Sequence, residues 1–192
     1  MSWLAAAVEW QSRAVVSRHL RVYLRNWHTA FLPPALEPVT MLVAFGVGLG
    51  GYVASLTWQG RPVEYMTYIA PGLLAYATFM TSVFQSLFAA FIRMRYQRTW
   101  EGQLTTQVEL RHVVWGEVLW AGLLATMYVV IVAVVLAGFD LAGLLHMRVG
   151  RLPLLLPLVF VAGCGFAALG LCFTALMPTI VHKNLPVFLL VL

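Results

Sequence analysis

The residues that could do chemistry gather in one polar stretch, from Arg93 to Glu117. This stretch holds four of the twelve Lys/Arg residues and three of the seven Asp/Glu residues of the 192-residue chain. Its mixed charge and the aromatic side chain of Trp100 could offer a protein partner both ion pairs and an anchor. A solvated loop with an ordinary membrane-interface tryptophan has the same composition. Physical reasoning alone leaves these two interpretations about even.

Motifs for catalysis are missing from the sequence. It contains no G-x-x-x-x-G-K-[ST] phosphate loop, no C-x-x-C, no H-E-x-x-H and no clustered carboxylates, and its five histidines are scattered. Gly46, Gly48 and Gly51 match G-x-G-x-x-G, but they lie inside an apolar run and not between a strand and a helix. We therefore expect no enzyme, and no catalytic, cofactor-binding or metal-ligating residue.

The composition is that of an integral membrane protein. Hydrophobic residues make up 61% of the chain and charged residues 10%, and the mean hydropathy is +0.86. A soluble domain needs far more charge to cover its surface. The net charge of +5 follows from membrane topology, as argued below, and does not indicate nucleic-acid binding.

The apolar runs predict an all-α polytopic membrane protein with four complete transmembrane helices and the start of a fifth. The expected spans are residues 32–55, 66–92, 118–139 and 153–177, with a fifth beginning at Pro186. Pro71-Gly72 should kink or locally open the second span, which makes this pair a candidate gating element. Small residues four apart in the fourth span, such as Gly163 and Ala167, predict a tight helix–helix face.

Residues 3–29 are expected to form an amphipathic helix. An apolar stripe of Val16, Leu20, Tyr23 and Trp27 lies opposite a basic stripe of Arg18, Arg21 and Arg25. This pattern suits a helix in the membrane interface, with its arginines and Trp27 at the lipid headgroups. Packing on a soluble partner is the alternative, and the span that follows almost at once favours the interface.

Counting Lys/Arg on each side of the membrane predicts the orientation. Nine lie in the N-terminal segment, in 93–117 and at Lys183, against three at Arg61, Arg148 and Arg151. Because positive residues concentrate on the cytoplasmic side, the N-terminus and 93–117 are expected in the cytoplasm.

Five short strings, in order along the chain, carry a resemblance to a known family. They are Glu37-Pro38, Gly48-Leu49-Gly50, Tyr68-Ile69-Ala70-Pro71-Gly72-Leu73-Leu74-Ala75, Arg98-Thr99-Trp100-Glu101 and Gly116-Glu117-Val118-Leu119-Trp120-Ala121. The chain resembles the ABC-2 type exporter permeases, and among them the nodulation-factor (lipooligosaccharide) exporters. The resemblance covers essentially the whole chain.

The resemblance implies a single ABC-2 type transmembrane domain over residues 1–192, with an interfacial helix at 3–29 and a cytoplasmic coupling loop at 93–117. The loop would dock on a separate ATP-binding subunit, which holds ATP-Mg, and a second permease copy would complete a homodimer in the bacterial inner membrane. The implied coupling residues are Arg98, Thr99, Trp100, Glu101, Leu104, Thr106, Glu109, Gly116 and Glu117.

Two departures from the family pattern qualify this expectation. Where the family has Thr-Pro in the loop, this chain has Thr106-Gln107, so the local turn is expected to differ. The family also has six spans and continues past residue 192, so the chain is expected to be truncated at its C-terminus. We predict a permease subunit of an ATP-driven exporter for an amphiphile such as a lipooligosaccharide, polysaccharide, lipid or hydrophobic drug. The alternative is a non-transporting membrane scaffold or a truncated remnant of such a permease.

Overall fold

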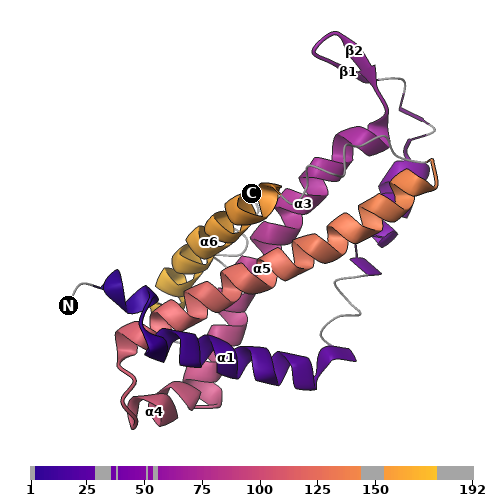
Figure 1. The fold of residues 1–192 in the computed structure, drawn as a ribbon. Helices are drawn as coiled ribbons and strands as arrows, with labels where there is room; N and C mark the ends of the chain where they lie inside the picture. Colours follow the sequence, from indigo (N-terminus) through magenta and orange to yellow (C-terminus); the bar gives the residue numbers. More distant parts are fainter. Residues whose placement is uncertain are drawn as a thin grey trace.

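The computed structural model describes residues 3–28, 36–37, 39–50, 52–53, 56–143 and 154–176. Its framework is a bundle of three long helices, α3 (Tyr65–Phe84), α5 (Leu110–Leu141) and α6 (Leu156–Leu176), which pack side by side (Figure 1). A shorter helix, α1 (Trp10–Arg25), packs against the first half of α5. The described part of the chain is therefore mainly helical, as predicted.

Three helices are long and apolar enough to cross a membrane. They comprise Tyr65–Tyr96, Leu110–Leu141 and Leu156–Leu176. The first is α3 together with two π-helical continuations, Gln85–Ala89 and Ile92–Tyr96. These helices correspond to the predicted spans at 66–92, 118–139 and 153–177. Leu110–Leu141 begins well before residue 118, so the last part of the predicted polar stretch 93–117 is the first two turns of α5.

The predicted first span, 32–55, falls only partly on described residues. Residues 39–41 are helical and Leu42–Val47 is a π-helical segment, but this region is not one of the three long apolar helices among the described residues. The start of the predicted fifth span at Pro186 lies outside the described residues. The prediction of four complete spans is therefore not confirmed.

Small residues bring α6 close to its two neighbours, as the sequence predicts. A Cβ atom added at Gly163 would lie 3.1 Å from Ser82 Oγ of α3 and 3.2 Å from Gly122 Cα of α5. One turn further along, Ala167 is fully buried. Thr174 Oγ1 then donates to the backbone oxygen of Ser86 at 2.8 Å, which joins the C-terminal end of α6 to the Tyr65–Tyr96 helix.

Helix α3 runs continuously through Pro71, and a Cβ added at Gly72 would meet nothing within 4 Å. The regular α-helical pattern changes later, at Gln85–Ala89 and Ile92–Tyr96. A π-helical segment inserts extra backbone and is often found at functional sites. The gating role of Pro71 and Gly72 stays a prediction.

A two-stranded hairpin lies at the end of the molecule opposite α1 (Figure 1). Strand β1 (Leu56–Trp58) pairs antiparallel with β2 (Arg61–Val63). The two turn residues have positive φ, 51° at Gln59 and 76° at Gly60. A two-residue turn with positive φ matches the twist of paired strands, and glycine adopts it without strain.

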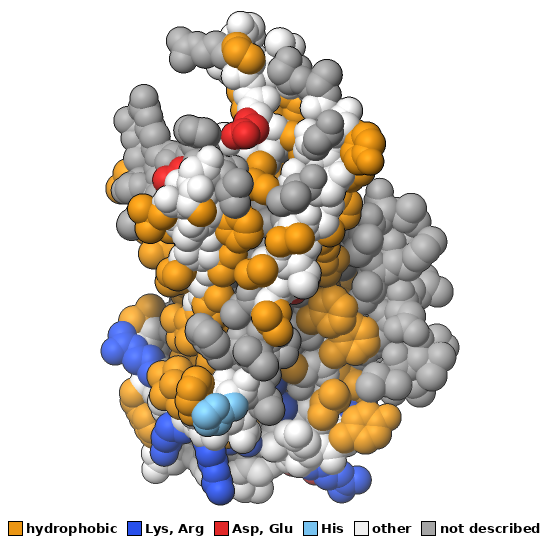
Figure 2. Space-filling model, turned by 90° about the vertical axis from the view of Figure 1, so that its right-hand side faces the viewer, with side chains coloured by type: hydrophobic (Ala, Val, Ile, Leu, Met, Phe, Trp, Pro, Cys, Tyr) orange, Lys and Arg blue, Asp and Glu red, His pale blue; other side chains and the backbone are white. Residues whose placement is uncertain are grey.

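Charge is distributed unevenly along the bundle. Figure 2 shows lysine and arginine side chains gathered at one end of the face in view, acidic side chains near the other end, and hydrophobic side chains between them. The basic end carries α1 and the short helix α4 (Thr99–Leu104).

Candidate functional site

A buried carboxylate, Glu117, lies where α1, α4 and the end of the α3 helix meet α5. Its side chain is 2% exposed. Arg93 Nε donates to Glu117 Oε1 at 3.0 Å, and Arg93 Nη2 donates to Glu117 Oε2. Trp100 Nε1 of α4 donates to Glu117 Oε1 at 3.1 Å. A buried carboxylate is stable only when it is paired in this way.

Helix α1 contributes a third group to this carboxylate. His19 Nε2 lies 3.3 Å from Glu117 Oε1, which is an ion-pair distance, although the ring is not aligned for a hydrogen bond. The His19 ring stacks on Trp120 of α5, with centroids 5.7 Å apart. Groups from three other segments thus converge on Glu117 of α5, and we call Glu117, Arg93, Trp100 and His19 the Glu117 cluster.

Arg93 is held from a second side by Gln85. With the amide of Gln85 oriented to satisfy its neighbours, its oxygen accepts from Arg93 Nη2 at 3.2 Å and from Trp120 Nε1 at 2.7 Å. Gln85 and Arg93 lie in the two π-helical segments that extend α3. The irregular end of this helix therefore supplies the polar side chains of the site.

Helix α4 is joined to the bundle through its first residues. Arg98, which precedes the helix, has a left-handed backbone with φ of 48°. This turn reverses the chain after Tyr96, and Thr99 Oγ1 then donates to the backbone oxygen of Arg93 at 3.1 Å. Thr99 and Trp100 are half-buried, and the remaining face of α4 is free to meet a partner.

The other predicted coupling residues, on α4 and beside it, are exposed. Arg98, Glu101, Leu104 and Thr106 all belong to this exposed surface, and Leu104 is 42% exposed. Glu109 is also exposed and pairs with Arg111 at 2.9 Å. The structure therefore separates the predicted residues into an outer, exposed set on and beside α4 and an inner set, Trp100, Gly116 and Glu117, within the bundle, with Thr99 half-buried between them.

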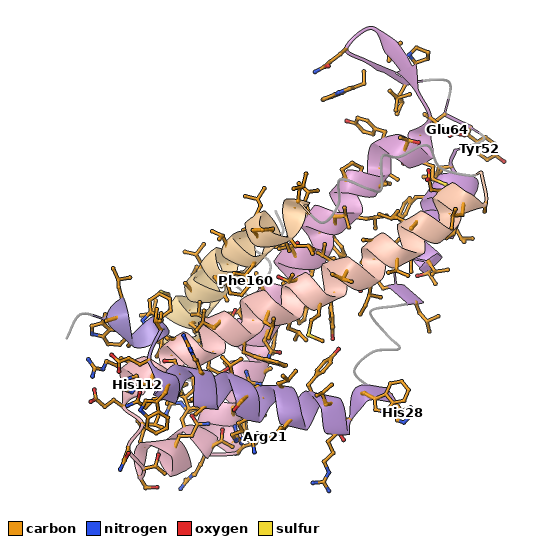
Figure 3. The ribbon with its side chains drawn as sticks, viewed as in Figure 1. Arg21, His28, Tyr52, Glu64, His112 and Phe160 are labelled. Carbon is orange, nitrogen blue, oxygen red and sulfur yellow. The ribbon has the colours of Figure 1, made fainter. Side chains whose placement is uncertain are left out.

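The N-terminal segment is fastened to the start of α5. His112 Nδ1 accepts from the backbone N–H of Glu109 at 3.0 Å, so Nε2 carries the proton that faces Glu9 Oε2 at 2.7 Å. Ser12 Oγ donates to the backbone oxygen of His112 of α5 at 3.3 Å and, within the N-terminal segment, to that of Ala6 at 2.6 Å. Trp115 Nε1 donates to the backbone oxygen of Trp3 at 2.6 Å. Figure 3 shows His112 at this junction and His28 at the far end of the α1 segment.

Gly116 allows α1 to approach α5 closely. A Cβ added at Gly116 would lie 2.5 Å from Val15 Cγ1 and 2.6 Å from Val15 Cβ, which is too close for any larger residue. Farther along, Tyr23 of α1 hydrogen-bonds Tyr128 of α5. Burial raises the pKa of Tyr23 above its ordinary value of 10.0.

The predicted basic stripe of α1 divides in the structure. Arg21 and Arg25 are exposed, and Arg18 is half-buried. Trp27 is 52% exposed. The face of α1 that packs on α5 consists of Ser12, Val15 and His19, so it lies beside the predicted stripe of Val16, Leu20, Tyr23 and Trp27 and shares Tyr23 with it.

Sequence reasoning missed His19, Arg93 and Gln85 as site residues. Ser12, Val15, His19 and Tyr23 recur at i, i+3, i+7 and i+11, which is also a helical stripe. This stripe was hidden because two of its residues are polar. No local signal marks Arg93 or Gln85, since Glu117 and Trp120, which they bind, lie on α5. Among the described residues, no group of three His, Cys, Asp or Glu side chains could hold a metal ion.

Comparison with known proteins agrees with this architecture. The family model described as ABC-2 type transporter matches residues 11–192. The chain is 34% identical over 167 residues to nodulation protein J of Rhizobium leguminosarum bv. trifolii, covering 83% of this chain and 60% of that protein. It is 32% identical to nodulation protein J of Sinorhizobium fredii, covering 88% of this chain and 61% of the relative.

A third relative, nodulation protein J of Rhizobium meliloti, is 31% identical, with 88% of this chain and 62% of the relative covered. The chain thus spans about 60% of the length of the curated relatives that it matches. No solved structure matches it. The family model covers nearly the whole chain, and the apolar helices fit a multi-pass membrane protein. The chain belongs to the ABC-2 type transporter family.

Proposed function

We propose that this chain is the membrane-spanning permease subunit of an ATP-driven exporter, and that α4 is the helix on which the ATP-binding subunit docks. The observation that carries this proposal is the division of α4 into two faces. Its inner side is tied to Glu117 through Trp100, while Glu101 and Leu104 are exposed. A helix that is bound to the bundle on one side and exposed on the other can transmit the movement of a docked partner to the bundle.

In this mechanism the ATP-binding subunits hold ATP-Mg and close when they bind it. Their movement pushes α4, and Trp100 carries the push to Glu117 on α5. The bidentate contact between Glu117 and Arg93 passes it to the end of the Tyr65–Tyr96 helix. A guanidinium–carboxylate fork resists rotation better than a single contact does, so both helices would move together and open a pathway in a homodimer.

The proposed setting is the bacterial inner membrane, with the N-terminus and α4 in the cytoplasm. The basic end of the bundle (Figure 2) supports this orientation, because arginine and lysine favour the cytoplasmic side. The proposed substrate is an amphiphile. Since the relatives carry the name nodulation protein J and the sequence resembles lipooligosaccharide exporters, a lipooligosaccharide is the first substrate to test.

The test is charge reversal on the exposed face of α4. The full-length protein carrying Glu101→Arg should reach the membrane at the wild-type level and lose at least about nine-tenths of ATP-dependent export, because like charges across a docking surface cost several kcal/mol. The control is Glu64→Arg, which makes the same charge change before α3, at the opposite end of the bundle. Its export should equal that of the wild type.

Normal export by Glu101→Arg would contradict the role of α4. If the full-length wild-type protein binds no ATP-binding subunit and exports nothing, the alternative of a non-transporting membrane scaffold replaces the proposal.

A further inference from the structure

A cavity of about 440 Å³ lies between α1, the end of the Tyr65–Tyr96 helix and α5. Its polar wall is formed by Arg18 and His19 of α1, Gln85 and Arg93 of the π-helical segments, and Gln97. Its apolar wall includes Val22 of α1 and Leu124 of α5. The cavity therefore combines basic, amide and hydrocarbon surfaces in one space beside two candidate membrane spans.

The charge of this wall is positive. Arg93 is neutralised by Glu117, which also lies near His19. Arg18 makes no ion pair with any residue that the structure describes, although it is half-buried and lines the cavity. A half-buried guanidinium without a carboxylate favours a bound anion, because the anion replaces the hydration that burial removes.

The second guanidinium is already held in position. Arg93 uses Nε and Nη2 to bind Glu117 and Gln85. Within the described part of the chain, Nη1 and its two N–H groups take no part in a hydrogen bond. A guanidinium whose orientation is fixed loses little entropy when it binds a ligand. Arg18 and Arg93 thus line one cavity, and Arg93 has free donors.

The basic side chains of the cavity lie near Glu117, and the side chains of Leu124 and Tyr128 line it farther along α5. Because Arg93 binds Glu117, it lies beside residue 117 of α5. Tyr128, which also lines the cavity, is eleven residues farther along α5, or about 16 Å at the rise of an α-helix. The rim residues Val22 and Ile92 are 54% and 37% exposed, so the cavity opens at its side. Such a space fits a charged headgroup followed by the beginning of an acyl chain.

We propose that this cavity binds the phosphate group of an anionic phospholipid, with Arg18 and Arg93 as its ligands. Arg18 lines the cavity. Arg21 and Arg25, the other two arginines of the predicted basic stripe, are exposed on α1. It does not depend on export, because the lipid would occupy the resting protein and brace α1 against the two spans. Phosphate is the recognised chemistry, and the lipid is the source that the apolar wall favours.

The test is native mass spectrometry of the full-length protein in detergent, titrated with phosphatidylglycerol, phosphatidylcholine or inorganic phosphate. Wild-type protein should retain phosphatidylglycerol with an affinity about tenfold higher than that of Arg18→Gln, as expected for one charge-assisted contact. The matched control Arg21→Gln removes an exposed arginine from the same helix and should bind as the wild type does. Arg18→Gln is preferred to an Arg93 variant because Arg93 also neutralises Glu117.

Three results would overturn the proposal. Equal phosphatidylglycerol affinity in Arg18→Gln and the wild type would remove Arg18 from the site. Equal binding of phosphatidylcholine and phosphatidylglycerol would mean that the cavity does not select an anionic lipid. Inorganic phosphate that displaces the lipid at equal concentration would identify a free phosphate site instead. Equal thermal midpoints of Arg18→Gln and Arg21→Gln would show that a difference in binding is not due to unfolding.

Discussion

The indole nitrogen of Trp100 donates a hydrogen bond to the buried carboxylate of Glu117 at 3.1 Å. This contact joins the short helix α4 to the long helix α5. Because Glu117 also binds Arg93 and lies beside His19, a displacement of Trp100 acts on three other segments. The position of α4 is therefore set by a polar contact inside the bundle as well as by its short connections.

Trp100→Phe removes the N–H donor and keeps an aromatic ring. We expect a loss of about 1–2 kcal/mol in the stability of the α4 region, because Glu117 loses a charge-assisted hydrogen bond. Hydrogen–deuterium exchange of residues 99–107 should become faster. Trp58→Phe, on the exposed hairpin, is the control and should leave this exchange unchanged. Unaltered exchange in Trp100→Phe would show that the contact does not position α4.

Glu117→Ala leaves Arg93 in the bundle without its carboxylate. Breaking a buried pair on one side costs about 3–5 kcal/mol, so the thermal midpoint in detergent should fall markedly. Glu101→Ala, at an exposed carboxylate on α4, should cost less than about 1 kcal/mol. The double variant Arg93→Met/Glu117→Leu should recover most of the loss. If it is as unstable as Glu117→Ala, the penalty does not come from the unpaired arginine.

Gly116→Val should force α1 away from α5, because even a Cβ at this position would lie 2.5 Å from Val15. Limited proteolysis should then cleave within residues 10–25 faster than in the wild type. The control is Gly138→Val on the same helix, where an added Cβ meets nothing within 4 Å. Equal cleavage of the two variants would contradict the close packing at Gly116.

The sequence was sufficient to predict the three long apolar helices of the described residues and the small-residue face around Gly163. The length of an apolar run and the spacing of glycines are local signals. It was insufficient at Leu110–Glu117. Arg111, His112 and Glu117 resemble a solvated loop by residue type, but the last two are buried. Their partners, Glu9 and His19, are about a hundred residues away, and no local pattern shows such a pairing.

The hairpin at residues 56–63 lies between the predicted spans 32–55 and 66–92. Gly60 at the second turn position was the available signal, but Gln59 also takes positive φ, which its residue type does not indicate. The hydrophobic pattern of the sequence does not predict the π-helical segments after Phe84 either. In the candidate site, Trp100 and Glu117 were named from a family resemblance, and their hydrogen bond became visible only in the structure.

The most direct test of the account is the docking of an ATP-binding subunit. The full-length protein should be purified from its native membranes in mild detergent, and its partners identified by mass spectrometry. We predict that an ATP-binding subunit copurifies with the wild type and is lost when residues 98–109 are replaced by a neutral linker of equal length. Recovery of that subunit at the same level from the linker variant, with the protein still folded, would contradict the account.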